Sequence, residues 1–263
     1  MSIIYKEIIM DLYGFYTGKI FDAYQYLGAH LQHRGVCFRT FAPSASRITV
    51  IGEFNNWQEW EMNKISDGNF WELFVPDAAE GMMYKYCIYD RAGNRVEHCD
   101  PYGFGMELRP NSASVIRDMD SYSFSDEEWM NSRSDCRKKP LNIYELHLGS
   151  FKKPEDKPDA WYTYEEMASI LIPYLKRNGY NYLELMPLNE YPCDESWGYQ
   201  ATGFCHQNGI GVIMDFVPVH FALDSYGLAM YDGTPLYEYP NSAVGVSEWG
   251  SCNFMHSRGE VRS

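Results

Sequence analysis

The stretch that decides the fold of the amino-terminal half is VCFRTFAPSASRITVIGEF, at residues 36–54. It holds two short runs rich in β-branched and aromatic residues, separated by the turn-forming residues Ala42, Pro43 and Ser44. Further along, NFWELFVP (69–76) and MYKYCIYD (83–90) repeat the pattern. The turn-forming residues 66–69 precede the first of these runs, and 91–94 follow the second. Short strands at this spacing predict an all-β, immunoglobulin-like sandwich.

From Leu141 onward the pattern changes to alternating strands and helices. Three apolar runs each predict a parallel strand with both faces covered. Between the first two runs, the capping box Thr163-x-x-Glu166 starts an amphipathic helix that Pro173 should kink and that Asn178-Gly179 ends. Strand, helix and strand form a βαβ unit. The three runs are LNIYELHLGSF (141–151), YLELMPL (182–188) and GIGVIMDFVPVHF (209–221).

The connection between the second and third runs is too short for a parallel crossover. Residues 189–204 are dense in Pro, Gly and aromatic side chains, and only CHQN (205–208) remains for a helix. Parallel neighbours need a crossover of about 10–12 residues. Either residues are missing at the Phe204-Cys205 junction or these strands do not sit together in an ordinary barrel, and we favour missing residues.

Composition excludes several classes of protein. The formal net charge of −14 over 263 residues disfavours nucleic acid and anionic membranes as partners. No apolar run approaches the ~20 residues of a membrane span, and the charges within residues 1–19 are unlike a signal peptide. The seven cysteines include no C-x-x-C pair, so we expect reduced thiols, a cytoplasmic location, and no metal or other cofactor.

Four residues are candidates for contact with a ligand. Trp57 ends the strand-to-loop sequence GEFNNW, where amides and an indole could receive a sugar; alternatively, Asn55 and Asn56 form a turn and Trp57 packs on the sandwich. Tyr199 follows the second parallel strand, and Asp215 and His220 lie at the end of the third, where barrels build their active sites. Core packing is the alternative for Tyr199 and His220.

Nine blocks of sequence can be compared with known families. They are AYQYLGAHL (23–31), GVCFRTFAPSA (35–45), GEFNNW (52–57), DPYGFGMELRP (100–110), IYELHLGSF (143–151), ELMPLNEYPCDESWGYQATGF (184–204), DFVPVHF (215–221), DGTPLYE (232–238) and SEWGSCNF (247–254). In this order the blocks resemble those of bacterial 1,4-α-glucan (glycogen) branching enzymes of the α-amylase superfamily. The LGAHL-type start, the WGYQ loop and the DGTPLYE block separate branching enzymes from plain amylases.

The resemblance implies a multidomain architecture with a glycogen-binding sandwich before a (β/α)₈ barrel. A complete barrel needs about 250 residues, so only its first three strands fit here, as a truncated TIM barrel. The expected domains are an N-terminal segment (1–27), the sandwich (28–120), a linker (121–140) and an incomplete catalytic barrel (141–263). We also expect residues 1–120 alone to fold and 141–263 alone to be insoluble or molten.

The family cuts an α-1,4 bond of glycogen or amylose-like chains and transfers the glucan to a 6-hydroxyl. By resemblance, Tyr199 stacks on the sugar at the cleavage subsite, His220 bonds that sugar and Asp215 supports the site. The family's nucleophile and general acid lie on later barrel strands, so no catalytic residue is assigned and these residues by themselves are expected to be inactive. The alternatives are a non-catalytic glucan-binding fragment and a related debranching or trehalose-forming hydrolase, which the DGTPLYE block disfavours.

Overall fold

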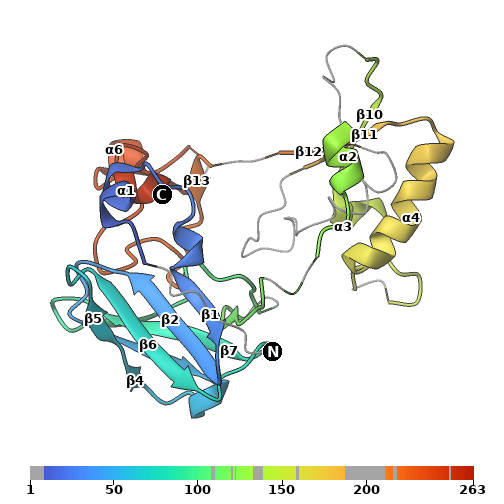
Figure 1. The fold of residues 1–263 in the computed structure, drawn as a ribbon. Coiled ribbons are helices and arrows are strands. Elements are labelled where there is room, and N and C mark those ends of the chain that lie inside the picture. The colour runs from blue at the N-terminus through green and yellow to red at the C-terminus, as the bar shows by residue number, and fades with distance from the viewer. Residues whose placement is uncertain are drawn as a thin grey trace. The chain divides into compact units, whose positions relative to one another are not determined.

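The computed structural model divides the chain into two compact units, one of residues 1–121 with 218–263 and one of residues 122–217 (Figure 1). Each unit has its own hydrophobic core, and each is described by itself. The residues that the structure describes are 9–107, 110–119, 121, 123–132, 139–157, 160–186, 211–215, 218–248 and 250–263.

The first unit is built on two antiparallel sheets, as the sequence predicts. One sheet has the order β1-β2-β6-β5, and the other has β4-β3-β7-β8 with β9 also paired to β7. Each expected strand is present within two residues of its predicted ends. The strands are β1 (Gly28–Gln32), β2 (Gly35–Phe41), β3 (Arg47–Gly52), β4 (Trp60–Glu61), β5 (Asn63–Ile65), β6 (Phe70–Pro76), β7 (Met83–Tyr89), β8 (Arg95–His98) and β9 (Ser114–Val115).

The core of the sandwich forms where the inward side chains of the two sheets meet. Phe38 of β2 and Tyr84 of β7 are fully buried, and their rings meet edge to face with centroids 4.9 Å apart. Alternation along the strands produces this arrangement, because residues two apart share one face of a sheet. Phe15, from the short helix α1 (Leu12–Thr17), is also fully buried and packs on Phe41. The turn η1 (Ala23–Gln25) leads from this helix to β1.

Residues 218–263 complete the first unit. They contain β13 (His220–Phe221), α6 (Ser242–Gly245), β14 (Cys252–Asn253) and α7 (Gly259–Arg262). Figure 1 shows α7 beside α1, and the hydroxyl of Ser263 donates to the carbonyl of Phe15 at 2.8 Å. The described contacts therefore group 218–263 with the sandwich, whereas the sequence groups these residues with the barrel-type strands. The domain boundaries expected from the sequence stay a prediction.

The second unit is a three-stranded parallel sheet covered by one helix. The order β10-β11-β12 and the parallel pairing are as predicted. The helix α4 starts at the Thr163 capping box, runs through Pro173 and ends at Asn178, and Gly179 follows at φ +75°. The elements are α2 (Glu127–Ser132), within the expected linker, β10 (Ile143–Leu146), α3 (Leu148–Phe151), α4 (Tyr164–Arg177), β11 (Tyr182–Leu185) and β12 (Gly211–Met214).

Two expected strands end earlier than predicted. The first stops at Leu146, and its continuation forms α3. The third stops at Met214, and His220–Phe221 form a separate strand that pairs antiparallel with Cys252–Asn253. Pro218 interrupts the apolar run between these two strands and cannot donate to a strand ladder. Within the described ranges, no helix combines the length and hydropathy that crossing a bilayer requires.

Candidate functional site

Trp57 lies in a turn in which the side-chain amide of Asn55 is already hydrogen-bonded. The side chain of Asn55 accepts from the backbone N–H of Gly52 at 2.9 Å and donates to the carbonyl of Val50 at 3.0 Å. Asn55 therefore closes the turn η2 (Glu53–Asn55) and is buried, as the turn interpretation expects. Asn56 and Trp57 follow at φ +52° and +58°, and the indole of Trp57 is 42% exposed. The ring, and not the Asn55 amide, is available to a ligand.

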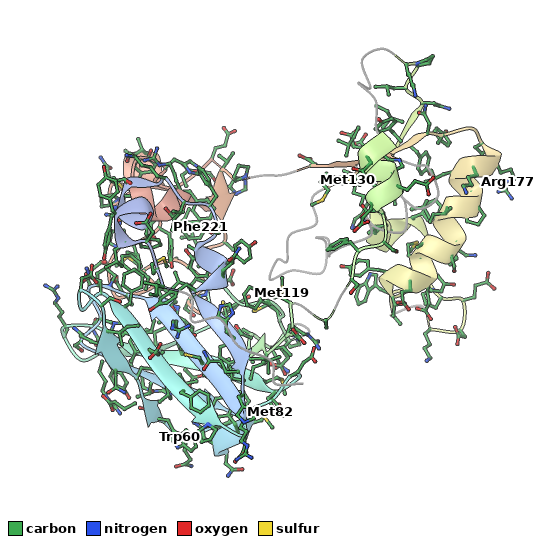
Figure 2. All side chains as sticks on the ribbon, viewed as in Figure 1. Trp60, Met82, Met119, Met130, Arg177 and Phe221 are labelled. Atoms are coloured by element: carbon green, nitrogen blue, oxygen red, sulfur yellow. The ribbon has the colours of Figure 1, made fainter. Side chains whose placement is uncertain are left out.

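A second exposed indole lies in the same part of the sandwich and was missed by the sequence reasoning. Trp60 of β4 is 39% exposed, and its ring lies 6.2 Å from that of Phe54. Figure 2 shows Trp60 at the end of the sandwich far from Phe221. The second tryptophan of NNWQEW (55–60) is the signal in the sequence that points to this indole. Exposed aromatic faces of this kind can stack on the C–H faces of sugars.

A network of charges holds β4 in place beside these indoles. Glu59 accepts from Arg95 Nε at 2.7 Å and from the Tyr89 hydroxyl at 2.9 Å, and it lies 3.2 Å from Arg47 Nη1. Burial tends to raise the pKa of Glu59, but the hydrogen bonds from Arg95 and Tyr89 outweigh it and leave the pKa below its ordinary value. Glu59 directly precedes Trp60 in the sequence. It thus has a structural role, as the charged hydrogen-bond partner of Arg95 and Tyr89.

The three barrel-type candidates fall in different parts of the structure. Asp215 follows β12, is exposed, and donates its backbone N–H to the carbonyl of Leu185 at 3.0 Å. His220 lies in β13 and belongs to the first unit. Tyr199 and the Phe204-Cys205 junction lie outside the described residues. Because Asp215 and His220 belong to separate units, the structure gives no distance between them.

His220 has a partner that the sequence reasoning missed. Its Nδ1 lies 2.9 Å from the hydroxyl oxygen of Ser251, just before β14. The ladder pairs His220 with Asn253, and the rings of Phe221 and Phe254 pack with centroids 4.6 Å apart. The SEWGSCNF block contains Ser251, but a serine carries no pattern that reveals its partner before the two strands are paired.

The DGTPLYE block (232–238) packs on the sandwich, and its two carboxylates accept backbone hydrogen bonds. Asp232 accepts from the backbone N–H of Ser44 at 2.8 Å and is 1% exposed. Glu238, which is 5% exposed, accepts from the backbone N–H of Met230 at 2.8 Å. The Tyr231 hydroxyl lies 2.8 Å from that of Thr40 in β2. Both carboxylates thus accept backbone hydrogen bonds inside the fold and have structural roles.

The buried carboxyl of Asp100 lies in the sandwich core, next to this docked block. It accepts from the hydroxyls of Tyr84 at 2.7 Å and Tyr86 at 3.0 Å, and from the backbone N–H of Tyr102 at 2.8 Å. Burial raises the pKa of Asp100 to about 6 against these three stabilising bonds. Its enclosure among tyrosines gives it a structural role. In the part of the chain that the structure describes, no three His, Cys, Asp or Glu side chains gather closely enough to hold a metal ion.

Comparison with known proteins places these features in context. Residues 26–103 match the family model of carbohydrate-binding module 48, the isoamylase N-terminal domain. The 1,4-alpha-glucan branching enzyme GlgB 2 of Clostridium perfringens strain 13 is 44% identical over 98% of this chain and 43% of that enzyme. GlgB of Fusobacterium nucleatum is 41% identical over 97% of this chain and 45% of that enzyme. The chain therefore spans less than half the length of these relatives.

Solved structures support the same fold at lower identity. A putative alpha amylase from Salmonella typhimurium is 21% identical with a TM-score of 0.67, covering 90% of this chain and 39% of that one. The catalytic module of the glycogen-degrading pneumococcal virulence factor SpuA is 17% identical with a TM-score of 0.66, covering 89% of this chain and 43% of that one. The described fold is thus that of the corresponding parts of these two solved structures.

The alignment also bears on the short crossover. It contains 287 positions with the C. perfringens enzyme, 24 more than the 263 residues of this chain. At least 24 positions therefore hold a residue of the relative and none of this chain. Such an excess of aligned positions is expected if this chain lacks part of a crossover segment that the relative has.

Proposed function

Since 98% of this chain aligns with 1,4-α-glucan branching enzymes, we propose that it carries the glucan-binding sandwich and the first three barrel strands of such an enzyme. The whole enzyme would cut an α-1,4-glucan chain, hold it covalently and transfer it to a 6-hydroxyl. The observation that carries the proposal is the identity of 44% over 98% of the chain, on both sides of the unit boundary.

In that enzyme, three residues of this chain would line the sugar at the cleavage subsite. Tyr199 would stack on the sugar ring, His220 would hydrogen-bond a sugar hydroxyl, and Asp215 would support the site. Asp215 fits this role because it directly follows a parallel strand, where barrel enzymes build their active sites. The excess of aligned positions supports a missing crossover, which we place at the Phe204-Cys205 junction.

These 263 residues by themselves would bind α-glucan without turning it over. Retaining transfer needs two carboxyl groups about 5–5.5 Å apart, one as nucleophile and one as acid/base. Five acidic residues follow His220 in the sequence, and two of them, Asp232 and Glu238, are buried and accept backbone hydrogen bonds. By resemblance, none of the five stands in the setting of the family's nucleophile. Binding would use the exposed indoles of Trp57 and Trp60, within the region matched to carbohydrate-binding module 48.

Affinity electrophoresis in gels containing glycogen tests the binding. We expect the glycogen to retard the parent chain and to retard Trp57→Ala and Trp60→Ala less. Trp161→Ala is the matched control, because its indole is 43% exposed but lies in the second unit. Equal mobility of the parent with and without glycogen would contradict glucan binding, and equal loss in Trp161→Ala would contradict a site on the sandwich.

Incubation with amylose tests the second half of the proposal. We expect no change of the iodine spectrum and no new α-1,6 linkages with these 263 residues. Turnover by a preparation of verified sequence would show that the catalytic carboxylates are among the residues present.

A further inference from the structure

The strand β13 is held by more than its two-residue pairing with β14. The backbone N–H of Phe254, directly after β14, donates to the carbonyl of Val219 at 3.1 Å. Next along the chain, Nε2 of His256 lies 2.7 Å from the carbonyl oxygen of Pro218, which can only accept a hydrogen bond. The residues that follow β14, called here the returning segment (254–258), therefore fix the backbone that enters β13.

The returning segment is bonded in turn to the DGTPLYE block. The backbone N–H of Met255 donates to the carbonyl of Tyr237 at 2.8 Å. Nη1 of Arg258 donates to the carbonyls of Pro235 at 2.7 Å and Leu236 at 2.6 Å. Because a guanidinium has only donors and a carbonyl oxygen only accepts, the direction of both side-chain bonds is fixed.

The DGTPLYE block is anchored on the sandwich. Asp232 accepts from the backbone N–H of Ser44, in the turn after β2, at 2.8 Å. The hydroxyl of Tyr231, directly before the block, lies 2.8 Å from that of Thr40 in β2. A continuous path of hydrogen bonds therefore runs from the sandwich through the block and the returning segment to the strand of His220.

Arg258 makes the charged connection in this path. Its side chain is partly buried, and among the residues that the structure describes it takes part in no ion pair. Hydrogen bonds from an ionised donor are roughly twice as strong as those between neutral groups. Removing the guanidinium would thus free two carbonyls of the block and would leave no described carboxylate without its ion-pair partner.

We propose that Arg258 is a positioning residue for His220, because it ties the returning segment, and with it β13, to the sandwich. The sandwich is then a support for the strand of His220 as well as a binding module. The consequence for catalysis rests on the proposed function, in which His220 bonds the sugar at the cleavage subsite. In that enzyme, the sandwich would set the place of the His220 ring before the glucan arrives.

NMR of the glucan-free 263-residue chain tests the inference with Arg258→Met, which keeps an apolar stem and removes every donor. The ring signals of His220 are assigned by their loss in His220→Gln. In Arg258→Met we expect these ring signals to shift, and the amides of Phe254 and Met255 to exchange with solvent about ten- to a hundredfold faster. The amides of β2 and β6 should keep their protection, which separates lost positioning from general unfolding.

Arg262→Met is the matched control for the loss of one positive charge. Arg262 lies in α7, four residues after Arg258, and its Nη2 lies 3.5 Å from the carbonyl of Thr17 instead of contacting the DGTPLYE block. We expect Arg262→Met to leave the ring signals of His220 and the amides of the returning segment as they are in the parent.

A second measurement needs no variant. In the parent chain, labelled with nitrogen-15 at its arginines, the two Nη1 hydrogens of Arg258 should give separate signals, because each is bonded to a different carbonyl. Rotation about the Cζ–Nη1 bond is then slow. A guanidinium that is free in water rotates rapidly and gives one averaged signal.

Three results would overturn the inference. The first is an averaged Nη1 signal of Arg258 in the parent, and this result decides the matter even where Arg258→Met fails to fold. The second is a folded Arg258→Met variant whose His220 ring signals match those of the parent. The third is an equal shift of those signals in Arg262→Met. Because all spectra are recorded without glucan, failure of glycogen retardation would contradict the proposed function and leave the role of Arg258 standing.

Discussion

The two compact units close their cores in different ways. In the first, two antiparallel sheets cover each other, and residues from α1 and from 218–263 fill the remaining sides of the core. In the second, a parallel three-stranded sheet has α4 packed against it, and the buried core is much smaller. Antiparallel sheets can be complete with one face in water, whereas parallel sheets are normally covered on both faces.

Two apolar side chains on the sheet of the second unit are exposed in the part of the chain that the structure describes. Ile143 of β10 is 38% exposed and Met214, at the end of β12, is 48% exposed. The strands read as buried in the sequence because their apolar runs suit a sheet that is covered on both faces. The apolar content of a strand therefore predicts its burial when all the layers that cover its sheet are in place. In the sandwich, the two sheets provide that cover for each other. We therefore expect different substitutions and truncations to destabilise each unit.

The largest expected effect comes from removing residues 218–263 from the first unit. Tyr231, Leu236 and Tyr237 are 0%, 3% and 7% exposed in the sandwich core. At about 1.5–3 kcal/mol for each buried side chain, their loss approaches the whole stability of a domain. We therefore expect residues 1–121 alone to lack cooperative thermal unfolding, which revises the expectation from sequence that 1–120 folds alone.

The control joins 1–121 to 218–263 through a flexible glycine-serine linker, which should restore a cooperative transition in calorimetry. An equally sharp transition for 1–121 alone would break the comparison, because the sandwich would then not depend on the docked segment.

Single truncations in the two cores should separate the units. Tyr231→Ala should cost about 3–5 kcal/mol in the first unit, and Leu175→Ala about 2–5 kcal/mol in the second, since both residues are 0% exposed. Amide hydrogen exchange measures each region. We expect Tyr231→Ala to weaken protection in β2 and β7 and to spare α4, with the reverse for Leu175→Ala. Equal weakening everywhere would show one cooperative body.

A pH effect should be confined to the first unit. Burial raises the pKa of Asp100 from 3.8 to about 6, so the folded state holds this proton more tightly than the unfolded chain does. The buried charge therefore costs nothing below pH 3.8, and its cost grows as the pH rises to about 6, reaching about 3 kcal/mol. The groups that face Asp100 are the hydroxyls of Tyr84 and Tyr86 and the backbone of Tyr102.

Urea unfolding of the parent and of Asp100→Asn at pH 4 and pH 7 measures this effect. The asparagine side chain of the variant does not titrate, so its own effect on the free energy of unfolding is the same at pH 4 and pH 7. The pH effect of Asp100 is therefore the change, between the two pH values, in the stability difference of variant and parent. We expect the variant to gain about 2.4 kcal/mol relative to the parent from pH 4 to pH 7. A difference that is constant with pH would show that Asp100 is solvated.

The smallest expected effect concerns the start of α4. The Thr163 hydroxyl accepts from the backbone N–H of Glu166 at 3.3 Å, and the Glu166 carboxylate accepts from the backbone N–H of Thr163 at 2.8 Å. Thr163→Ala should cost about 1 kcal/mol and weaken amide protection in α4. Ser169→Ala, in the exposed interior of the same helix, is the control and should be neutral. Equal effects of Thr163→Ala and Ser169→Ala would contradict a stabilising role of the cap.

Sequence reasoning succeeded where a pattern is local. The strands of the sandwich, the capping box at Thr163 and the stop at Gly179 all lie where the residue types predict them. The reasoning failed for His220, which it placed at the end of a third parallel strand. The strand is broken near Pro218, and its partner residues 252–253 lie more than thirty residues later in the sequence. No local sequence pattern predicts the pairing of strands so far apart in the sequence.

The sequence by itself determined the family resemblance, the two kinds of secondary structure and the short crossover at Phe204-Cys205. These follow from residue types at fixed spacing, which depend on backbone geometry and are written locally. Only the tertiary structure decided that Tyr231 docks beside Thr40, that Asp100 is enclosed by tyrosines, and that Ser251 faces the ring of His220. Those contacts join residues between 14 and 191 positions apart, and side chains so distant in sequence meet only once the sheets and turns have been assembled.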